Sequence, residues 1–370
     1  MGYFIGFLYF YLWYTSILAG YICLYCPIFP ILLLSNKLYR YLTDIILTFW
    51  QQYPTVLLQA LCKTEVRVYG DAINSNEISI LVMNHRTRTD WNFLWPSLYH
   101  SIRGNYRFKY STKFLLKDSI RFIPGPGWVM QLTLWLFIKR SWKKDKETLE
   151  KFCDYIEALN YKFNILVFPE GTDFTEETKK KSDAYAKKNH LEQYNYLLHP
   201  RTTGFAYLSS QLIKQNCLDA IYDLTIMYPD VIPQTEKFLF QGKFPRQVKL
   251  HIVRYPLAAI PTSEDDLKLF LMNIWNDKEI TLKEYYITHN SIPGPCLKKS
   301  TLELFPALIF WTVLPFIAMY LMIYYVNFRR SCLFHTIFLV IINFLTPGFQ
   351  WFEMALYDVK KEIFGHRFAL

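Results

Sequence analysis

The sequence predicts an α/β fold whose largely parallel sheet is flanked by helices, with an N-terminal membrane anchor before it and a C-terminal hydrophobic helix pair after it. Through the middle of the chain, short apolar runs typical of strands alternate with stretches long enough to form helices. Charge is nearly absent from three stretches near the two ends. Each of these stretches is longer than the roughly 18 residues that indicate a membrane span.

The N-terminal stretch, residues 1–36, contains no charged side chain and many aromatic rings. It lacks the basic start and the small-residue cleavage site of a secretory signal, so we interpret it as a retained transmembrane anchor. Lys37 and Arg40 follow at once, and a positive flank marks the cytoplasmic side of a membrane. Residues 37–64 are apolar with scattered polar side chains, which predicts a helical segment in the membrane interface that Pro54 breaks.

Residues 65–303 carry nearly all of the charge and are expected to form one domain attached to the bilayer. Its apolar runs predict strands at 65–70, 78–83, 164–171, 223–229 and 247–254, with helices near 88–100, 127–138, 143–159 and 203–215. Strands that alternate with helices in this way favour a parallel sheet, in which reactive groups gather where strands end.

Two more apolar stretches follow the domain: Leu304–Phe328 has no charged residue, and Ser331–Phe352 has only His335. They predict two transmembrane or re-entrant helices within 304–352, followed by a tail at 353–370. The charges around this pair do not fix its orientation.

The net charge of +10 points to a membrane surface and not to nucleic acid, because anionic lipid headgroups attract lysine and arginine next to such anchors. No H-x-x-x-H pattern or cysteine cluster with ligand spacing occurs, so we predict no metal site.

The first predicted strand end carries His85 and Asp90 in "NHRTRTD". On one regular helix two residues five positions apart lie roughly 140° apart around the axis, so a contact requires a break between them. Thr87 or Thr89 supplies that break as a helix N-cap, which leaves Asp90 ionised in the first turn and able to orient the imidazole of His85. This is the base and orienter of a Ser-His-Asp triad without the serine, and it suits a substrate that brings its own hydroxyl. A capped surface histidine near an ordinary helical acid would produce the same pattern.

The second strand end carries "FPEGT", in which Pro169 stops sheet pairing and Gly171 lets a ligand approach the backbone. The backbone N–H groups of Gly171 and Thr172 would cradle a phosphate, with Glu170 organising nearby groups. A tight turn with an exposed glutamate is the alternative.

Together, "NHRTRTDW" at 84–91 and "VFPEGT" at 167–172 resemble the glycerolipid acyltransferases, the family of 1-acylglycerol-3-phosphate and lysophospholipid acyltransferases. "KDSIRFIPGPGW" and "LFIKR" resemble further blocks of the family and place Lys117 and Arg140 on its pattern. "TIMYPDVIP" departs from the proline-rich fourth block, because Tyr228 precedes the first proline and the second is displaced to Pro233. Within the family, the chain is most similar to lysocardiolipin acyltransferase-like proteins.

The resemblance implies acyl-CoA as donor, a lysophospholipid or lysophosphatidic acid as acceptor, no cofactor, and a location in the endoplasmic reticulum membrane with the catalytic domain in the cytosol. His85 and Asp90 are the expected catalytic residues. The expected substrate-binding residues are Asn84, Arg88, Lys117, Arg140, Glu170, Gly171, Thr172 and Arg201. Two alternatives stay open: a phospholipid transacylase that does not use CoA, and a lipid-binding membrane protein without catalysis. The oligomeric state is not predicted.

Overall fold

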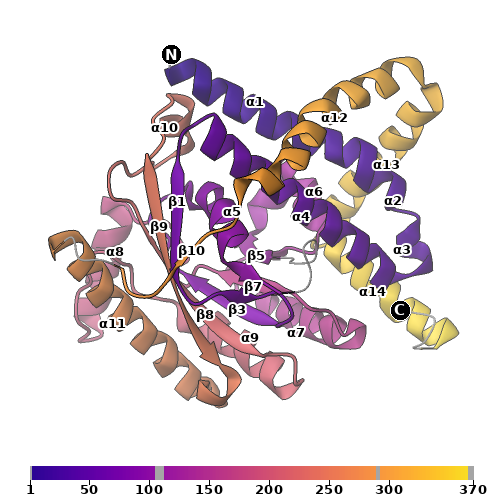
Figure 1. Ribbon diagram of the computed structural model, residues 1–370. Helices are drawn as coiled ribbons and strands as arrows, with labels where there is room; N and C mark the ends of the chain where they lie inside the picture. The colour runs from indigo at the N-terminus through magenta and orange to yellow at the C-terminus, as the bar shows by residue number, and fades with distance from the viewer. Residues whose placement is uncertain (1, 105–111, 289–291, 366–370) are drawn as a thin grey trace. The chain divides into compact units, whose positions relative to one another are not determined.

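The computed structural model describes residues 2–104, 112–288 and 292–365 (Figure 1). The chain divides into two compact units. The first unit comprises Met1–Tyr9, Pro54–Asn105 and Phe163–Thr301, and the second comprises Phe10–Tyr53, Tyr106–Lys162 and Leu302–Leu370.

The first unit contains a sheet in the order β10-β1-β9-β8-β3-β7. Its strands are β1 Glu65–Gly70, β3 Ser79–Met83, β7 Asn164–Val167, β8 Ala220–Met227, β9 Gln247–Pro256 and β10 Cys296–Leu297. β3 is parallel to both of its neighbours and β1 is parallel to β9, whereas β8–β9 and β1–β10 are antiparallel. The predicted α/β class with a largely parallel sheet is confirmed.

The register of this sheet brings the two polar strand ends to one edge. Every residue of β3, β7 and β8 is buried, as expected for central strands covered on both faces. Val82 on β3 lies opposite Val167 on β7, so Asn84 and Phe168 leave the sheet near each other. The carboxyl ends of parallel strands therefore deliver both motifs to the same place.

Helices surround this sheet: α5 Asp90–Ser101, α8 Glu176–Lys188, α9 Thr202–Lys214, α10 Glu236–Phe240 and α11 Glu264–Thr288. α5 lies against β1, while α9 and α11 pack against each other and α11 also contacts β8. The sequence patterns had predicted α5 and α9 but not α11. A short parallel pair, β2 Ile73–Asn74 and β4 Ile102–Arg103, and the 3-10 turn Leu257–Ala259 complete the unit.

The first turns of helix α1, Gly2–Gly20, pack against α10. A Cβ atom on Gly6 would lie 2.3 Å from the backbone oxygen of Leu239, so only glycine allows this approach. Tyr9 is fully buried and donates a hydrogen bond of 2.8 Å to Asn92 on α5. The start of the N-terminal helix is therefore attached to the helix that carries Asp90.

The second unit is mainly helical, and its described residues contain one parallel strand pair, β5 with β6. Beyond the rest of α1 and the start of α4 Asn36–Ala60, its elements are the π-helix Tyr21–Tyr25, α2 Cys26–Ile28, α3 Ile31–Leu34, β5 Thr112–Lys117, the 3-10 turn Asp118–Phe122, α6 Pro126–Leu132, β6 Leu136–Ile138, α7 Trp142–Leu159, the 3-10 turn Thr301–Leu304, α12 Phe305–Tyr324, α13 Val326–Leu345 and α14 Phe349–Phe364.

Two local predictions were wrong. The helix at 127–138 ends at Leu132, because Leu134 takes a positive φ of 64° that no helix continues through, and residues 136–138 form β6. Helix α4 runs through Pro54 without ending. A proline removes one intrahelical hydrogen bond, and we attribute the continuation to the dense burial around it, where Tyr53 and Thr55 are both fully buried.

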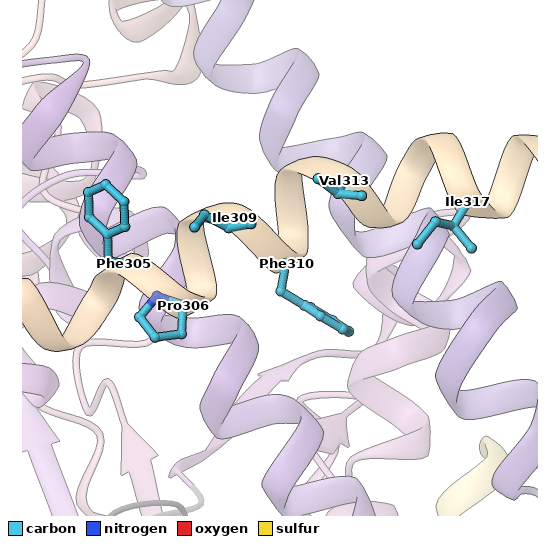
Figure 2. Close-up of a pocket in the computed structure, with 6 residues that line it drawn as sticks. All are labelled: Phe305, Pro306, Ile309, Phe310, Val313 and Ile317. Carbon is cyan, nitrogen blue, oxygen red and sulfur yellow. The ribbon is translucent and has the colours of Figure 1, made fainter.

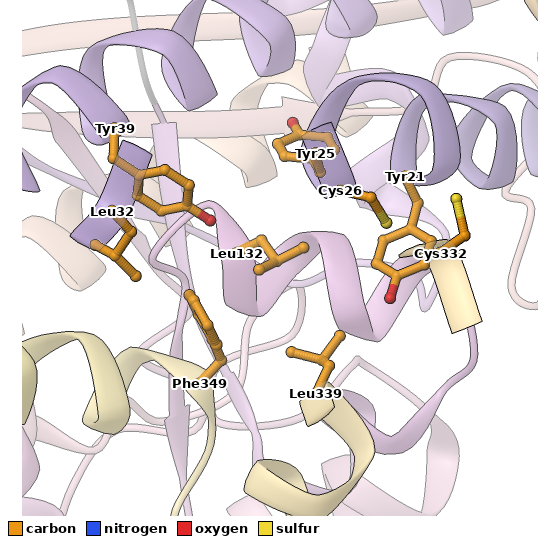
Figure 3. Packing of buried hydrophobic residues seen from close by; sticks show 9 residues of the cluster. All are labelled: Tyr21, Tyr25, Cys26, Leu32, Tyr39, Leu132, Cys332, Leu339 and Phe349. Carbon is orange, nitrogen blue, oxygen red and sulfur yellow. The ribbon is translucent and has the colours of Figure 1, made fainter. Parts of the chain in front are cut away.

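The core of the second unit combines an apolar cluster with buried ion pairs. The cluster consists of Tyr21, Tyr25, Cys26, Leu32, Tyr39, Leu132, Cys332, Leu339 and Phe349 (Figure 3). Beside it, the fully buried Arg40 pairs with Glu353 of α14 at 2.8 Å, and the fully buried Lys113 of β5 pairs with Asp44 at 2.7 Å. Paired burial of this kind is the condition under which charges are tolerated inside a protein.

Among the residues that the structure describes, three helical stretches are long and apolar enough to cross a membrane: Gly2–Leu34, Thr301–Tyr324 and Val326–Leu345. The second of them carries a hollow lined by Phe305, Pro306, Ile309, Phe310, Val313 and Ile317 (Figure 2). These side chains are all apolar, so the hollow suits hydrocarbon and offers no group for acid–base chemistry.

Candidate active site

Asn84 directly follows β3, and its side chain bonds to the backbone of the neighbouring strand β8. Its side-chain oxygen accepts from the backbone N–H of Ile226 at 2.9 Å, and its amide nitrogen donates to the carbonyl of Ile226 at 3.3 Å. Both polar ends of the buried Asn84 are thus bonded to β8, which fixes the start of the following loop. Its expected role in substrate binding stays a prediction.

His85 and Asp90 are in contact, with 3.0 Å between Nδ1 of the imidazole and Oδ2 of the carboxylate. The break between them has the expected form, since Thr89 occupies the N-cap position and Asp90 begins α5. The hydroxyl of Thr89 does not cap the helix and donates instead to the carbonyl of Pro233 at 2.7 Å.

The carboxylate of Asp90 is completely buried and accepts four hydrogen bonds. Oδ2 accepts from Nδ1 of His85 and from the backbone N–H of Thr87, at 3.0 Å each. Oδ1 accepts from the hydroxyl of Thr87 at 2.8 Å and from the hydroxyl of Tyr228 at 2.6 Å. Three donors besides the imidazole therefore fix the orientation of the acid.

The ring of His85 stacks on Phe168, with 4.3 Å between ring centroids, and its side chain is 21% exposed. Burial lowers the pKa of His85, but the hydrogen bond and charge of Asp90, together with the charges of Glu170 and Asp173, outweigh burial and raise this pKa above its ordinary value. With Nδ1–H donated to Asp90, Nε2 carries the lone pair, and it makes no hydrogen bond among the described residues. The ring is therefore arranged as a base.

Glu170 lies directly beside this pair. It is 4% exposed, and its Oε1 accepts from the backbone N–H of His85 at 3.3 Å. Oε2 has no hydrogen-bond partner among the described residues. Burial raises the pKa of Glu170 to about 8, while the charge of His85 opposes the rise. A buried acceptor without a partner, next to a base, is a candidate contact for a ligand hydroxyl.

Gly171 adopts a positive φ of 73°, and a Cβ there would lie 3.3 Å from Nε of Arg201. The backbone N–H of Gly171 donates to the carbonyl of Phe168 at 3.0 Å within the turn, and the expected phosphate-binding role of Gly171 and Thr172 stays a prediction. The hydroxyl of Thr172 contacts Asp173 at 3.4 Å. Arg201, exposed at the start of α9, is the basic group that the structure brings to this loop.

Arg88 is directed into solvent, with its side chain 66% exposed, and it pairs with Glu236 at 3.2 Å. Lys117 and Arg140 belong to the second unit. There Lys117 ends β5 in register with Ile138, two positions before Arg140, so these two cations follow the same end of one strand pair. The binding roles of all three residues stay predictions.

Sequence reasoning missed the groups that hold the site from outside the two motifs. The loop after β8 bonds both motif loops, because the carbonyl of Gln234 accepts from the backbone N–H of Arg88 at 3.3 Å and its amide donates to the carbonyl of Phe174 at 2.9 Å. Lys278 of α11 is fully buried, forms an ion pair with Asp223 of β8, and donates to a β8 carbonyl. Nothing in the pattern around Lys278 predicts a buried charge.

No group of three or more histidine, cysteine or acidic residues that would hold a metal ion occurs in the part of the chain that the structure describes.

Comparisons with known proteins agree on one family. The acyltransferase family model matches residues 65–229, and the acyltransferase C-terminus model matches residues 238–312. The chain is 40% identical to lysocardiolipin acyltransferase 1 of Gallus gallus over 82% of this chain and 81% of that protein. It is 37% identical to lysocardiolipin acyltransferase 1 of Mus musculus over 90% and 89% of the two chains.

The chain is also 38% identical to lysophosphatidylinositol acyltransferase 10 of Caenorhabditis elegans, over 68% of this chain and 64% of that protein. Among solved structures, the 1-acyl-sn-glycerophosphate acyltransferase PlsC of Thermotoga maritima matches 78% of this chain and all of that one, with a TM-score of 0.45 and 16% identity. From its sequence relatives and both family models, this chain belongs to the glycerolipid acyltransferase family, which acts on lysophospholipids and lysophosphatidic acid.

Proposed function

We propose that the protein is a membrane-bound O-acyltransferase that moves a fatty acyl group from acyl-CoA to the free hydroxyl of a lysophospholipid, with His85 as general base. The observation that carries this proposal is the His85–Asp90 contact of 3.0 Å, in which the second ring nitrogen is left without a protein partner among the described residues. A base without an internal nucleophile suits a substrate that supplies the hydroxyl.

The proton and the electron pairs follow from this geometry. Nε2 of His85 takes the proton of the acceptor hydroxyl as its oxygen attacks the thioester carbonyl. The C–O bond forms, the tetrahedral intermediate collapses, and the C–S bond breaks. The proton on His85 then passes to the departing sulfur, which leaves as CoA thiol, and the base is regenerated.

The acceptor is held, in this proposal, by groups around the same edge. The partnerless Oε2 of Glu170 is available to a glycerol hydroxyl, and Arg201 beside Gly171 is available to a phosphate. Thr172, Arg88, Lys117 and Arg140 remain in the proposed binding set on the resemblance alone. The relatives named for lysocardiolipin and lysophosphatidylinositol make these two lipids the first acceptors to test.

The three apolar helical stretches support attachment to a membrane, and the endoplasmic reticulum is the proposed location. In this proposal the acyl chains of the substrates stay in the hydrocarbon of the bilayer, and the reacting hydroxyl contacts His85 at the membrane–water interface.

The test is acyl transfer from labelled oleoyl-CoA by detergent-purified protein, with lysocardiolipin, lysophosphatidylinositol and lysophosphatidic acid as acceptors. His85→Ala is compared with His190→Ala, which removes an exposed histidine after α8. Positioned base catalysis contributes about 10²- to 10⁴-fold, so His85→Ala is expected to lose activity by that factor and His190→Ala to keep it.

Product from one acceptor that is lost only in His85→Ala supports the proposal and identifies the lipid. Acyl exchange between phospholipids in the absence of CoA would show that the protein is a transacylase and not an enzyme that uses acyl-CoA. Full activity in His85→Ala would overturn the mechanism.

A further inference from the structure

Tyr228 lies at the end of β8, in the segment where this chain departs from the family pattern. Its side chain is 2% exposed, and its hydroxyl donates to Oδ1 of Asp90 at 2.6 Å. This is the shortest of the four hydrogen bonds to the Asp90 carboxylate. A tyrosine one strand away thus contacts the acid that orients His85.

Two further contacts hold Tyr228 in place. Its backbone N–H donates to the hydroxyl of Tyr286 on α11 at 3.1 Å. Its ring packs edge-on against Phe93 of α5, with 5.7 Å between the ring centroids and 79° between the ring planes. The hydroxyl is therefore delivered to Asp90 by a side chain that is fixed at both its backbone and its ring.

The hydroxyl also has a fixed protonation state. Burial raises the pKa of Tyr228 well above its ordinary value, and the adjacent charge of Asp90 raises it further. Tyr228 is consequently a neutral donor at all working pH values, and Asp90 is the acceptor.

We propose that Tyr228 is a positioning residue, which acts through Asp90 to set the orientation and the basicity of His85. The proposal rests on the His85–Asp90 mechanism proposed above and adds to it a donor that neither sequence motif contains. Tyr228 does not contact the imidazole, so its effect on the reaction passes through the carboxylate.

The direction of the effect follows from the charge on Asp90. A hydrogen bond from Tyr228 draws negative charge toward Oδ1 and away from Oδ2, which faces His85. Removing this donor strengthens the attraction between Oδ2 and a protonated imidazole. The pKa of His85 then rises, and less of the base is free near neutral pH.

Other charged groups face His85 and do not change in this comparison. Glu170 and Asp173 both raise the pKa of His85 through their charges. Lys278 acts on Glu170, and Tyr286 lies against Tyr228. Glu170, Asp173, Lys278 and Tyr286 are present in both the wild type and Tyr228→Phe. A difference between the pH profiles of these two proteins therefore reports the lost hydroxyl.

The test compares Tyr228→Phe with Tyr222→Phe. Tyr222 is a matched control because it is also buried on β8 and its hydroxyl donates to Glu77 at 2.6 Å, away from Asp90. Both variants lose one buried tyrosine hydroxyl, Tyr222 from β8 and Tyr228 from the residue directly after it, and only Tyr228→Phe loses a contact to Asp90.

For Tyr228→Phe, kcat is expected to fall about tenfold, the lower end for one hydrogen bond to a charged group, with little change in KM for either substrate. The acid limb of the kcat/KM profile is expected to move to higher pH. For Tyr222→Phe, both the limb and kcat are expected to stay at wild-type values. A purely structural role for Tyr228 would lower the thermal stability of Tyr228→Phe and leave its pH profile at that of the wild type.

If Tyr228→Phe does not fold, 3-fluorotyrosine at position 228 keeps the ring and makes the hydroxyl a stronger donor. It is expected to move the acid limb to lower pH, opposite to the phenylalanine variant. If His85→Ala is inactive and the pH profile of a folded variant at position 228 is unchanged, the role of Tyr228 is overturned. Activity in His85→Ala would instead show that the underlying mechanism had failed.

Discussion

Replacing Asp90 by asparagine separates the charge of this residue from its shape. Oδ2 accepts from two groups that only donate, the backbone N–H of Thr87 and Nδ1–H of His85. Oδ1 accepts from the hydroxyls of Thr87 and Tyr228, and a hydroxyl can also accept. The amide nitrogen of the introduced asparagine is therefore expected to face the two hydroxyls, and its oxygen to keep the place of Oδ2.

This orientation preserves the ring position and the tautomer of His85, so the variant loses mainly the negative charge. A hydrogen bond to a charged group contributes about 1.5–3 kcal/mol, and each 1.4 kcal/mol is tenfold in rate, so kcat is expected to fall about 10- to 150-fold. Asp90→Ala removes all four acceptor contacts and is expected to approach the loss of His85→Ala, about 10²- to 10⁴-fold.

The pH profile gives a second, independent measure. Burial lowers the pKa of His85 and Asp90 raises it above the ordinary value. Without the charge of Asp90 burial dominates, so the pKa of His85 falls and the acid limb of kcat/KM moves to lower pH in Asp90→Asn. This is the opposite of the shift expected for Tyr228→Phe.

The assay is kcat and kcat/KM against pH for wild type, Asp90→Asn and Asp90→Ala, measured with labelled acyl-CoA and the preferred acceptor. Asp266→Asn, an exposed change at the start of α11, is the control for the chemical substitution itself. If Asp90→Asn is as inactive as Asp90→Ala, the ring has turned or changed tautomer, and the reasoning from the two hydroxyls is refuted.

Three further outcomes are expected. Burial raises the pKa of Glu170 to about 8, so the folded protein keeps a proton that the unfolded chain loses near 4.5. The folded state therefore loses stability as the pH rises from about 4.5 to about 8, and Glu170→Gln should flatten the fall in melting temperature measured between about pH 5 and 8. Lys278→Met leaves Asp223 buried without its cation and should cost about 3–5 kcal/mol of unfolding free energy, with most of it regained when Asp223→Leu is added. Gly6→Ala places a Cβ against the backbone of α10 and should lower the free energy of unfolding by about 1–3 kcal/mol. The Cβ of Gly204→Ala meets nothing within 4 Å, so this variant should stabilise α9, and thermal unfolding in detergent compares the two variants.

Where the sequence pattern was local, it predicted the structure well. The buried run of β3 and the polar knot after it indicated a strand end, and the five-residue spacing of His85 and Asp90 required the break that the structure contains before α5. These inferences succeed because the periodicity that distinguishes a strand from a helix is carried by residues close together in the sequence.

The rest depended on partners far away in the chain. The buried residues of helix α11 follow one face, but apolar residues such as Leu269, Ile280 and Ile287 are exposed on the others, so the apolar residues in its sequence show no clear amphipathic period. The burial of Lys278 is explained only by Asp223, 55 positions earlier, with which it forms an ion pair. Gly171 is a different case, because its N–H was expected to be open and is bonded to Phe168, three residues earlier in the same turn.

The contacts of the segment after β8 give a physical reason for its departure from the family pattern. Tyr228 donates its hydroxyl to Asp90, and the carbonyl of the displaced Pro233 accepts the hydroxyl of Thr89. One unusual residue thus contacts Asp90 itself, and the other contacts the loop between His85 and Asp90. A change in this block alters how firmly the acid and its loop are held, while the two motifs keep their sequence. Variation after β8 is therefore expected to tune the basicity of His85, and the paired pH profiles of Tyr228→Phe and Asp90→Asn measure that tuning directly.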